Sequence, residues 1–277
     1  MKVISTISEL RTALKGINKI ALVPTMGNLH EGHLALVRKA KKCADCVVVS
    51  IYVNPLQFLP NEDFNQYPRT LSEDCKLLQN LDVDIAFVPD DKILFPVKQK
   101  ILVLLPPVAD QFEGKFRPGF FRGVATIVLK LFNIIQPDIA LFGKKDYQQL
   151  HIIRLMVQQL DLPIEILDEE IIRASDGLAL SSRNRYLNDI QRIEACHLYQ
   201  TLNTVKTDIQ AGQNRFASLE ENAVRVLKTR GWSVDYIAVL NQVSLIPAHP
   251  EDKALVVLAA ARIGQTRLID NIEILKS

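Results

Sequence analysis

The sequence predicts an α/β protein, built on a doubly wound parallel sheet and followed by a smaller α+β domain. Three observations lead to this prediction. Up to residue 175, apolar strand-like runs alternate with helical patterns. These runs are continuously apolar, which is typical of parallel strands covered on both faces. After "SDGLALSSRNRYL" the order changes, because two helical stretches are followed by three strand-like runs.

In the first part, the strand-like runs are rich in Ile, Val or Leu, and they lie at 19–25, 46–53, 84–89, 138–143 and 164–173. Apolar residues at helical spacing occupy the intervals at 32–44, 70–80, 121–135 and 146–160. A helix that connects two strands lets them lie parallel in one sheet. We therefore expect one domain over residues 1–177 and a second over residues 178–277.

The second domain begins with two helical patterns, at 189–210 and 218–230, joined through Ala211 and Gly212. Three strand-like runs follow, at 234–240, 253–263 and 266–274. Helices and strands that are segregated along the chain predict an α+β domain.

The composition narrows the class of protein. The chain has 277 residues, of which 48% are hydrophobic and 23% charged, as in globular proteins. A net charge of +2 gives no sign of a broad nucleic-acid surface. The start, "MKVISTISELRTALKG", does not resemble a signal peptide. No apolar run reaches the ~18 residues of a membrane span, so we expect a cytoplasmic protein.

The four cysteines are Cys43, Cys46, Cys75 and Cys196. Cys43 and Cys46 form a C-x-x-C, but it precedes a strand, whereas a redox C-x-x-C follows one and opens a helix. A zinc site would need a second pair of ligands, and the other two cysteines stand alone in the sequence. The pattern therefore favours reduced, structural thiols.

Polar and basic side chains follow four of the predicted strands. They are Thr25, Met26, Gly27, His30 and His33; Asn54, Pro55 and Gln57; Lys144, Lys145, Asp146 and Gln149; and Ser175, Asp176, Gly177, Ser181, Ser182 and Arg183. Ligands of open α/β sheets bind beyond the carboxyl ends of the strands. The sequence therefore predicts a binding site at this rim.

The first turn contains neither G-x-G-x-x-G nor G-K-[ST], so two common nucleotide fingerprints are absent. A glycine-bearing turn before a helix nevertheless offers backbone N–H groups to phosphate. Histidine, lysine, arginine and serine side chains suit a polyphosphate that loses pyrophosphate, because they stabilise the charge that develops on the leaving group.

Other interpretations exist for the individual residues. A zinc motif would separate its histidines by four positions on a formed helix, whereas His30 and His33 are three apart, with Gly32 between them. Both histidines could instead be ordinary surface or core side chains. Asn54-Pro55 could be a plain turn, with Gln57 in a solvent-facing loop. Met26 could serve packing, Asp146 could cap the following helix, and "LSSRN" could begin one.

Six segments together resemble the pantoate–β-alanine ligase family. They are "PTMGNLHEGHLALV", "VVVSIYVNPLQF", "YPRTLSED", "GVATIVLKLFNIIQPDIALFGKKDYQQLHIIRLMV", "DGLALSSRNRYL" and "TRLIDNI", in the family's order. H-x-G-H alone marks a wider group of nucleotidylyl transferases and tRNA synthetases, whereas the whole set is specific. The resemblance implies a Rossmann-like fold of the nucleotidylyl-transferase type and a C-terminal domain that closes as a lid.

The resemblance also implies an activity. ATP would adenylate the carboxylate of D-pantoate with loss of pyrophosphate, and β-alanine would then attack the pantoyl adenylate, releasing AMP and pantothenate, an intermediate of coenzyme A biosynthesis. Mg²⁺ would be carried mainly by the phosphates of ATP. The family is typically homodimeric, and neither nucleic acid nor a membrane is an expected partner.

Residues are assigned from the matching motifs. The implied ATP site consists of Met26, Gly27, Asn28, Leu29, His30, Glu31, Gly32, His33, Gly143, Lys144, Lys145, Asp146, Ile172, Leu180, Ser181, Ser182 and Arg183. Among these, His33 is the implied proton donor, His30 lies beside the phosphates and Lys145 is the catalytic lysine. Gln57, Gln149 and Asn54 would hold pantoate, and Gln57 would also meet β-alanine. Glu73 and Asp74 match, weakly, positions linked to the metal.

The chain departs from the family in three places. Phe120 replaces the usual histidine of "RPGHF", Lys144 replaces the usual glutamate of "FGEKD", and the segment 92–115 lacks the usual Tyr-Pro-x-Gly turn. Two rival functions remain at this point: a nucleotidylyl transferase that stops at a nucleotide-linked product, and a sensor that binds ATP without turnover. The ligase is distinguished by forming AMP and an amide only when an amine is present.

Overall fold

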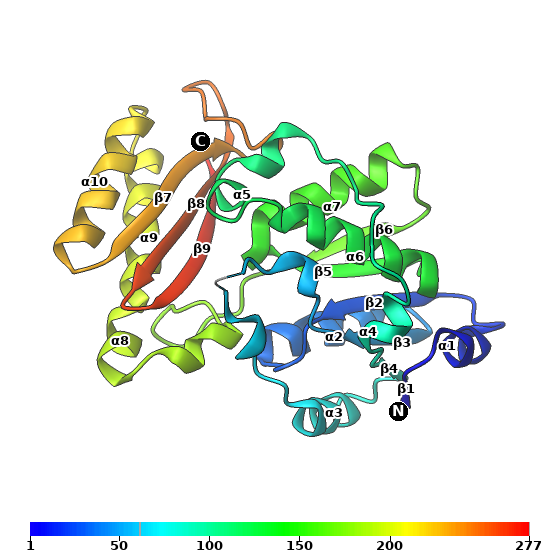
Figure 1. The fold of residues 1–277 in the computed structure, drawn as a ribbon. Coiled ribbons are helices and arrows are strands. Elements are labelled where there is room, and N and C mark those ends of the chain that lie inside the picture. Colours follow the sequence, from blue (N-terminus) through cyan, green and yellow to red (C-terminus); the bar gives the residue numbers. More distant parts are fainter. Residues whose placement is uncertain (61, 277) are drawn as a thin grey trace. The chain divides into compact units, whose positions relative to one another are not determined.

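A computed structural model describes residues 1–60 and 62–276 (Figure 1), and the chain divides into two compact units. The first unit comprises Met1–Lys144 and Gln149–Glu170, and the second comprises Lys145–Gln148 and Ile171–Ser277. The sequence pattern placed the start of the second domain at residue 178, whereas the second unit of the structure already includes residues before 178. The reason is local, since Arg173 pairs with Asp270 through two hydrogen bonds of 2.7 and 2.9 Å.

The first unit contains a six-stranded sheet in the order β1-β4-β3-β2-β5-β6. Its strands are β1 (Lys2–Ile4), β2 (Ile20–Thr25), β3 (Cys46–Ile51), β4 (Ile85–Phe87), β5 (Ile139–Gly143) and β6 (Glu165–Glu169). Every neighbouring pair is parallel. The predicted parallel sheet is confirmed.

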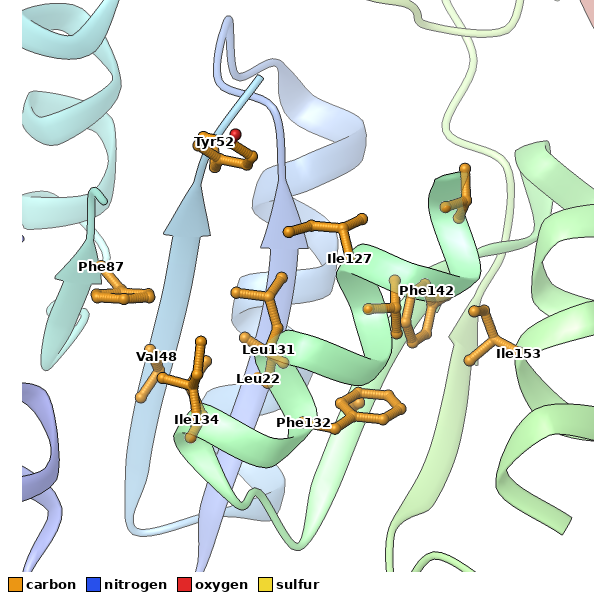
Figure 2. Close-up of a cluster of buried hydrophobic side chains, with 14 of the residues drawn as sticks. Leu22, Val48, Tyr52, Phe87, Ile127, Leu131, Phe132, Ile134, Phe142 and Ile153 are labelled. Carbon is orange, nitrogen blue, oxygen red and sulfur yellow. The ribbon is translucent and has the colours of Figure 1, made fainter. Parts of the chain in front are cut away.

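Helices cover both faces of this sheet. They are α1 (Ile7–Leu14), α2 (Glu31–Cys43), α3 (Leu71–Gln79), α4 (Asp91–Leu94), α5 (Glu113–Phe116), α6 (Phe120–Ile135) and α7 (Tyr147–Gln159), with 3₁₀ turns η1 (Pro55–Gln57), η2 (Asp63–Asn65), η3 (Pro107–Asp110) and η4 (Lys144–Asp146). Side chains alternate along a strand, so Leu22 enters the core beneath α6, whereas Val23 enters the core beneath α2. Figure 2 shows Leu131 and Ile134 of α6 against Leu22 and Val48. The arrangement is doubly wound, as predicted.

The order of strands reverses at β2, which gives the sheet its switch point between β2 and β5. β2 pairs with β3 along all of Ile20–Thr25. With β5, by contrast, β2 pairs only through Ala21 and Leu22. Pro24 lies beyond this short ladder, and a proline has no N–H to donate to a neighbouring strand. The two strands are therefore joined at their amino ends, and ligand-binding turns follow their carboxyl ends.

The second unit is an α+β structure, as predicted. It contains η5 (Ser182–Tyr186), α8 (Asp189–Glu194), α9 (Cys196–Gln210), α10 (Phe216–Thr229) and the antiparallel strands β7 (Ser233–Asn241), β8 (Ala254–Ile263) and β9 (Thr266–Leu275). Leu202 and Leu227 from the helices pack with Val257 and Ile274 from the strands in one core. Apolar residues on one helix face and alternate strand positions account for this packing.

Two predicted elements have different bounds. The strand expected to run to residue 173 ends at Glu169, because the chain passes into the second unit after Glu170. The helix expected over 189–210 is divided into α8 and α9 at Ala195. Within residues 1–60 and 62–276, none of the helices combines the length and the apolar character needed to cross a membrane.

Candidate active site

His30 and His33 cap the start of α2 reciprocally. The backbone N–H of Gly32 donates to Nδ1 of His30 at 3.1 Å, and the backbone N–H of His30 donates to Nδ1 of His33 at 3.3 Å. The two ring centroids lie 4.1 Å apart. In a neutral imidazole that accepts at Nδ1, the proton is on Nε2. The cap therefore fixes both histidines as Nε2–H donors at the end of β2.

Gly32 is explained by the same geometry. A Cβ atom at position 32 would lie 2.9 Å from Cε1 and 3.0 Å from Nδ1 of the His30 ring. Distances this short do not occur between unstrained atoms, so any side chain at position 32 would displace the imidazole. The H-x-G-H spacing thus places two rings on the first turn of a helix and leaves room for the first ring to fold back.

The turn between β2 and α2 is tied to a buried carboxylate. Gly27 and Asn28 both adopt positive φ angles, of 79° and 50°. This conformation directs the N–H groups of Asn28 and Leu29 at Asp74 of α3, with distances of 3.0 and 2.8 Å. We expected the N–H groups of this turn to be available to phosphate. That expectation fails for Asn28 and Leu29, because Asp74 already occupies them.

Asp74 also accepts from the Thr70 hydroxyl at 3.2 Å, and the residue is only 1% exposed. Both of its oxygens are therefore used inside the protein, which does not fit the metal-ligand role that the resemblance implied. Glu73 is exposed on the same helix. Within the described part of the chain, no three His, Cys, Asp or Glu side chains form a group that could hold a metal ion.

Met26, Asn54 and Gln57 lie together in the first unit. The Gln57 amide Nε2 donates to Met26 Sδ at 3.2 Å, and Asn54 Nδ2 donates to Gln57 Oε1 at 3.0 Å. Asn54 is 1% exposed and also donates to the carbonyl of Gly123 at 3.2 Å. Its contacts fix the amide of Gln57, so Asn54 acts here as a support for the neighbouring glutamine.

Arg117 supports the same loop, a role that the sequence pattern missed. Its guanidinium binds Glu62 at 2.6 and 2.7 Å, donates to the carbonyl of Gln57 at 3.1 Å and lies 3.7 Å from the centre of the Phe120 ring. The Phe120 departure therefore supplies an aromatic face on which Arg117 stacks. Gln57, Phe120 and Gly123 also line a hollow of about 190 Å³ in this unit.

The predicted residues after β5 divide between the two units. Gly143, Lys144 and Gln149 belong to the first unit, whereas Lys145 and Asp146 belong to the second. Lys144 Nζ forms an ion pair with Glu170 Oε1, and the Lys144 side chain is only 16% exposed. The charge of Lys144 is therefore already matched by a carboxylate within its own unit.

The remaining predicted nucleotide residues lie in the second unit. The N–H of Leu180 donates to the carbonyl of Ile172 at 2.9 Å, next to an isolated antiparallel bridge between Arg173 and Ala179. Ser181 is the N-cap of η5, and its hydroxyl accepts from the N–H of Arg183 at 3.3 Å. The structure brings Ile172, Leu180 and the Ser181–Arg183 turn together. The cap that we considered for "LSSRN" is present as well.

The cysteines of the C-x-x-C behave as structural residues. Cys43 and Cys46 are free thiols, and Cys46 is buried in the sheet. Burial, aided by the nearby charge of Asp84, raises the pKa of the Cys46 thiol to about 11. A thiol with this pKa stays protonated at neutral pH and is a poor nucleophile.

Comparison with known proteins gives consistent matches along the whole chain. The family model described as Pantoate-beta-alanine ligase matches residues 2–273. The pantothenate synthetase of Nitrosospira multiformis is 58% identical over 274 residues, which are 99% of this chain and 98% of the relative. The corresponding protein of Nitrosomonas europaea is 56% identical over 98% of both chains.

Solved structures agree with these matches. Pantothenate synthetase from Thermus thermophilus superposes with a TM-score of 0.93 and 41% identity, over 98% of this chain and 99% of the other. The pantoate-beta-alanine ligase of Francisella tularensis, complexed with beta-gamma ATP and beta-alanine, superposes with a TM-score of 0.84 and 35% identity, over 98% of this chain and 97% of the other.

Proposed function

The chain belongs to the pantoate-beta-alanine ligase family, and on this basis we propose which residues bind each substrate and which act in the reaction. The activity is the ATP-dependent joining of pantoate to β-alanine, which gives pantothenate. The rival functions, a nucleotidylyl transferase and an ATP sensor, do not form this amide.

The proposed reaction has two steps. A carboxylate oxygen of D-pantoate attacks the α-phosphorus of ATP, and the bond to pyrophosphate breaks. The amine of β-alanine then attacks the carbonyl carbon of the pantoyl adenylate, loses a proton and displaces AMP. Transfer to AMP makes the carboxylate oxygen a good leaving group, so both steps depend mainly on positioning and on stabilising the departing charge.

The reciprocal histidine cap is the observation that supports this proposal most strongly. Since Nδ1 of each ring accepts a backbone N–H, each ring has one proton to donate, at Nε2. Both donors follow β2 at the switch point of the sheet, where ligands of this fold bind. We assign His33 as the donor to the reacting phosphate and His30 as a second donor to the phosphates.

Other contacts extend the nucleotide site. Met26–His33 and Gly143–Lys144 border the site in the first unit, where Asp74 holds the N–H groups of Asn28 and Leu29 and Glu170 holds the charge of Lys144. Lys145, Asp146, Ile172 and Leu180–Arg183 contribute from the second unit. The second unit acts as a lid that keeps water from the adenylate. Mg²⁺ would be carried mainly by the phosphates of ATP, because both oxygens of Asp74 are taken up by hydrogen bonds inside the protein.

Gln57 and Gln149 are the proposed ligands of pantoate, and Gln57 also meets β-alanine. Asn54 holds the side-chain amide of Gln57 and therefore determines which atoms of Gln57 the substrate meets.

We further propose that the enzyme is cytoplasmic and homodimeric. Leu102 and Leu104 are 40% and 95% exposed on a segment whose alternate residues, Val103 and Leu105, pack inward, and this pattern suits an apolar contact with a second copy.

The decisive test is the dependence of two assays on substrate. Exchange of pyrophosphate into ATP is expected to require D-pantoate, and AMP release is expected to require β-alanine as well. Unrelated hydroxy acids serve as controls. Equal exchange with those acids, or none with D-pantoate, would contradict the assignment, and ATP binding without turnover would point to a sensor.

Alanine substitution of Gln57 or Gln149 is expected to weaken pantoate binding selectively. Each change removes a hydrogen bond to a neutral ligand group, which costs roughly 0.5–1.5 kcal/mol. The KM for pantoate should rise by the corresponding factor, of about 2 to 13, while the KM for ATP stays nearly constant. Calorimetry with D-pantoate measures the same change directly. Unchanged affinity in both variants would show that these glutamines are ordinary loop residues.

A further inference from the structure

The short segment Lys145–Gln148 comprises the end of η4 and the first two residues of α7, and it belongs to the second unit although the rest of α7 belongs to the first. Two hydrogen bonds join it to β9. The side chain of Asn271 donates from Nδ2 to the backbone carbonyl of Lys145 at 3.0 Å, and the Tyr147 hydroxyl donates to Glu273 Oε1 at 2.8 Å. Asn271 and Glu273 are two residues apart on the strand, so they share one face of it.

Asn271 is held firmly where it makes this contact. The residue is 4% exposed, and its own N–H donates to Asp270 Oδ1 at 2.7 Å. Asp270, also 4% exposed, receives both arms of the Arg173 guanidinium, which in addition donates to the carbonyl of Asn271 at 3.2 Å. The backbone of Asn271 is thus fixed from two sides, and its amide is a rigid anchor for the carbonyl of Lys145.

The neighbouring lysine has a different attachment. Lys144 pairs with Glu170 inside the first unit, whereas Lys145 is anchored by Asn271 inside the second. The two lysines are adjacent in the sequence, but they belong to different units. The peptide bond between them is a point at which the chain passes from one unit to the other.

We propose that Asn271 is a positioning residue for Lys145, because it fixes the backbone from which the ammonium group extends. This inference rests on the proposed role of Lys145 at the leaving pyrophosphate. Asn271 does not touch the substrate itself. Asn271 sets the position of the Lys145 backbone, and the backbone position determines how far the Lys145 side chain reaches. This gives the "DN" of the C-terminal "TRLIDNI" segment a role in the reaction.

The test is a double-mutant cycle on the full chain, measured by D-pantoate-dependent pyrophosphate exchange. Asn271→Leu has a similar shape but cannot donate to the Lys145 carbonyl. A displacement of about 1 Å costs on the order of 10²-fold in rate, so we expect kcat to fall by about 10- to 100-fold. The KM for pantoate should change little, because the glutamines that bind it lie in the first unit.

In the Lys145→Ala background, Asn271→Leu should change the exchange rate by less than about twofold, because residues that act as a unit have non-additive effects. Tyr147→Phe, which removes the second bond to β9, is a milder variant in case Asn271→Leu does not fold. Asn241→Leu, at the end of β7, is the control. It removes the Asn side-chain bond to Asp252 at 2.9 Å and the bonds that Asn241 Oδ1 accepts from Val243 and Ser244, but neither of the bonds that join Lys145–Gln148 to β9. Its kcat should stay near that of the unmodified enzyme.

Each other outcome has a distinct meaning. Full activity of both Asn271→Leu and Tyr147→Phe, with a slow Lys145→Ala, would overturn the positioning role alone. Effects of Asn271→Leu and Lys145→Ala that multiply would also overturn it, because Asn271 would then act independently of the lysine. Full activity of Lys145→Ala would overturn the proposed function of the lysine, and with it this inference.

Discussion

Lys145→Ala is expected to slow D-pantoate-dependent pyrophosphate exchange by about 10²–10³-fold, equivalent to ~2.7–4 kcal/mol of transition-state stabilisation. The proposed reason is that the ammonium group meets the negative charge that accumulates on pyrophosphate as it leaves. A preorganised charge is worth more in a closed site than in water. Initial rates should be measured at saturating ATP and Mg²⁺, with a thermal melt to confirm folding.

Lys144→Ala is the matched control for this experiment, because it removes the same charge from the adjacent position. Lys144 is paired with Glu170, whose side chain is 72% exposed, and a pair so open to solvent contributes ~1 kcal/mol or less. Exchange should therefore fall only slightly. A larger loss in Lys144→Ala than in Lys145→Ala would show that the first lysine, and not the second, meets the phosphates.

Asp74→Ala is expected to destabilise the fold strongly. The carboxylate accepts the N–H groups of Asn28 and Leu29 and the hydroxyl of Thr70, all in a buried position. A buried donor left without a partner costs about 1–3 kcal/mol. With two backbone donors affected, the free energy of unfolding should fall by about 2–6 kcal/mol. Urea unfolding at constant pH measures the change, and Asp74→Asn is a milder variant if the alanine variant does not fold.

Glu73→Ala provides the comparison, because Glu73 is exposed one position earlier on α3. A substitution at such a surface site usually changes stability by less than about 0.5 kcal/mol. The pair also separates two roles for Asp74. If Asp74→Ala kept its stability but needed far more Mg²⁺ for exchange, the carboxylate would be a metal ligand and the structural role would be wrong.

The fold was largely predictable because buried parallel strands leave a strong local pattern. β3 was expected at 46–53 and occupies Cys46–Ile51, all of it buried. β1 was not predicted. It has only three residues, Lys2 and Val3 are exposed, and its pairing partner β4 lies more than 80 residues further along the chain. A strand that short has no periodicity from which to be recognised.

The turn that carries the two histidines could be predicted from the sequence, but the contacts that support it could not. The spacing of His30, Gly32 and His33 marked the turn, and in the structure the two histidines cap α2 while Gly32 leaves room for the His30 ring. That Asp74 fills the backbone donors of this turn could not be inferred, since the partners are 45 residues apart in sequence. The contact between Asn271 and Lys145 spans 126 residues. Local patterns carry no information about such contacts, which only the folded chain creates.

The short ladder between β2 and β5 has a mechanical consequence. β2 is hydrogen-bonded to β3 along its full length, so β3 fixes the position of the turn that carries His30 and His33. The ladder between β2 and β5 ends at Leu22. From Leu141 to Gly143, β5 is paired only with β6. The turn after β2 is therefore attached to the half of the sheet that contains β3, and the turn after β5 is attached to the half that contains β6. No ladder bond joins the two strands next to these turns, so the gap between their carboxyl ends follows from the sequence through Pro24, which has no N–H to donate to β5.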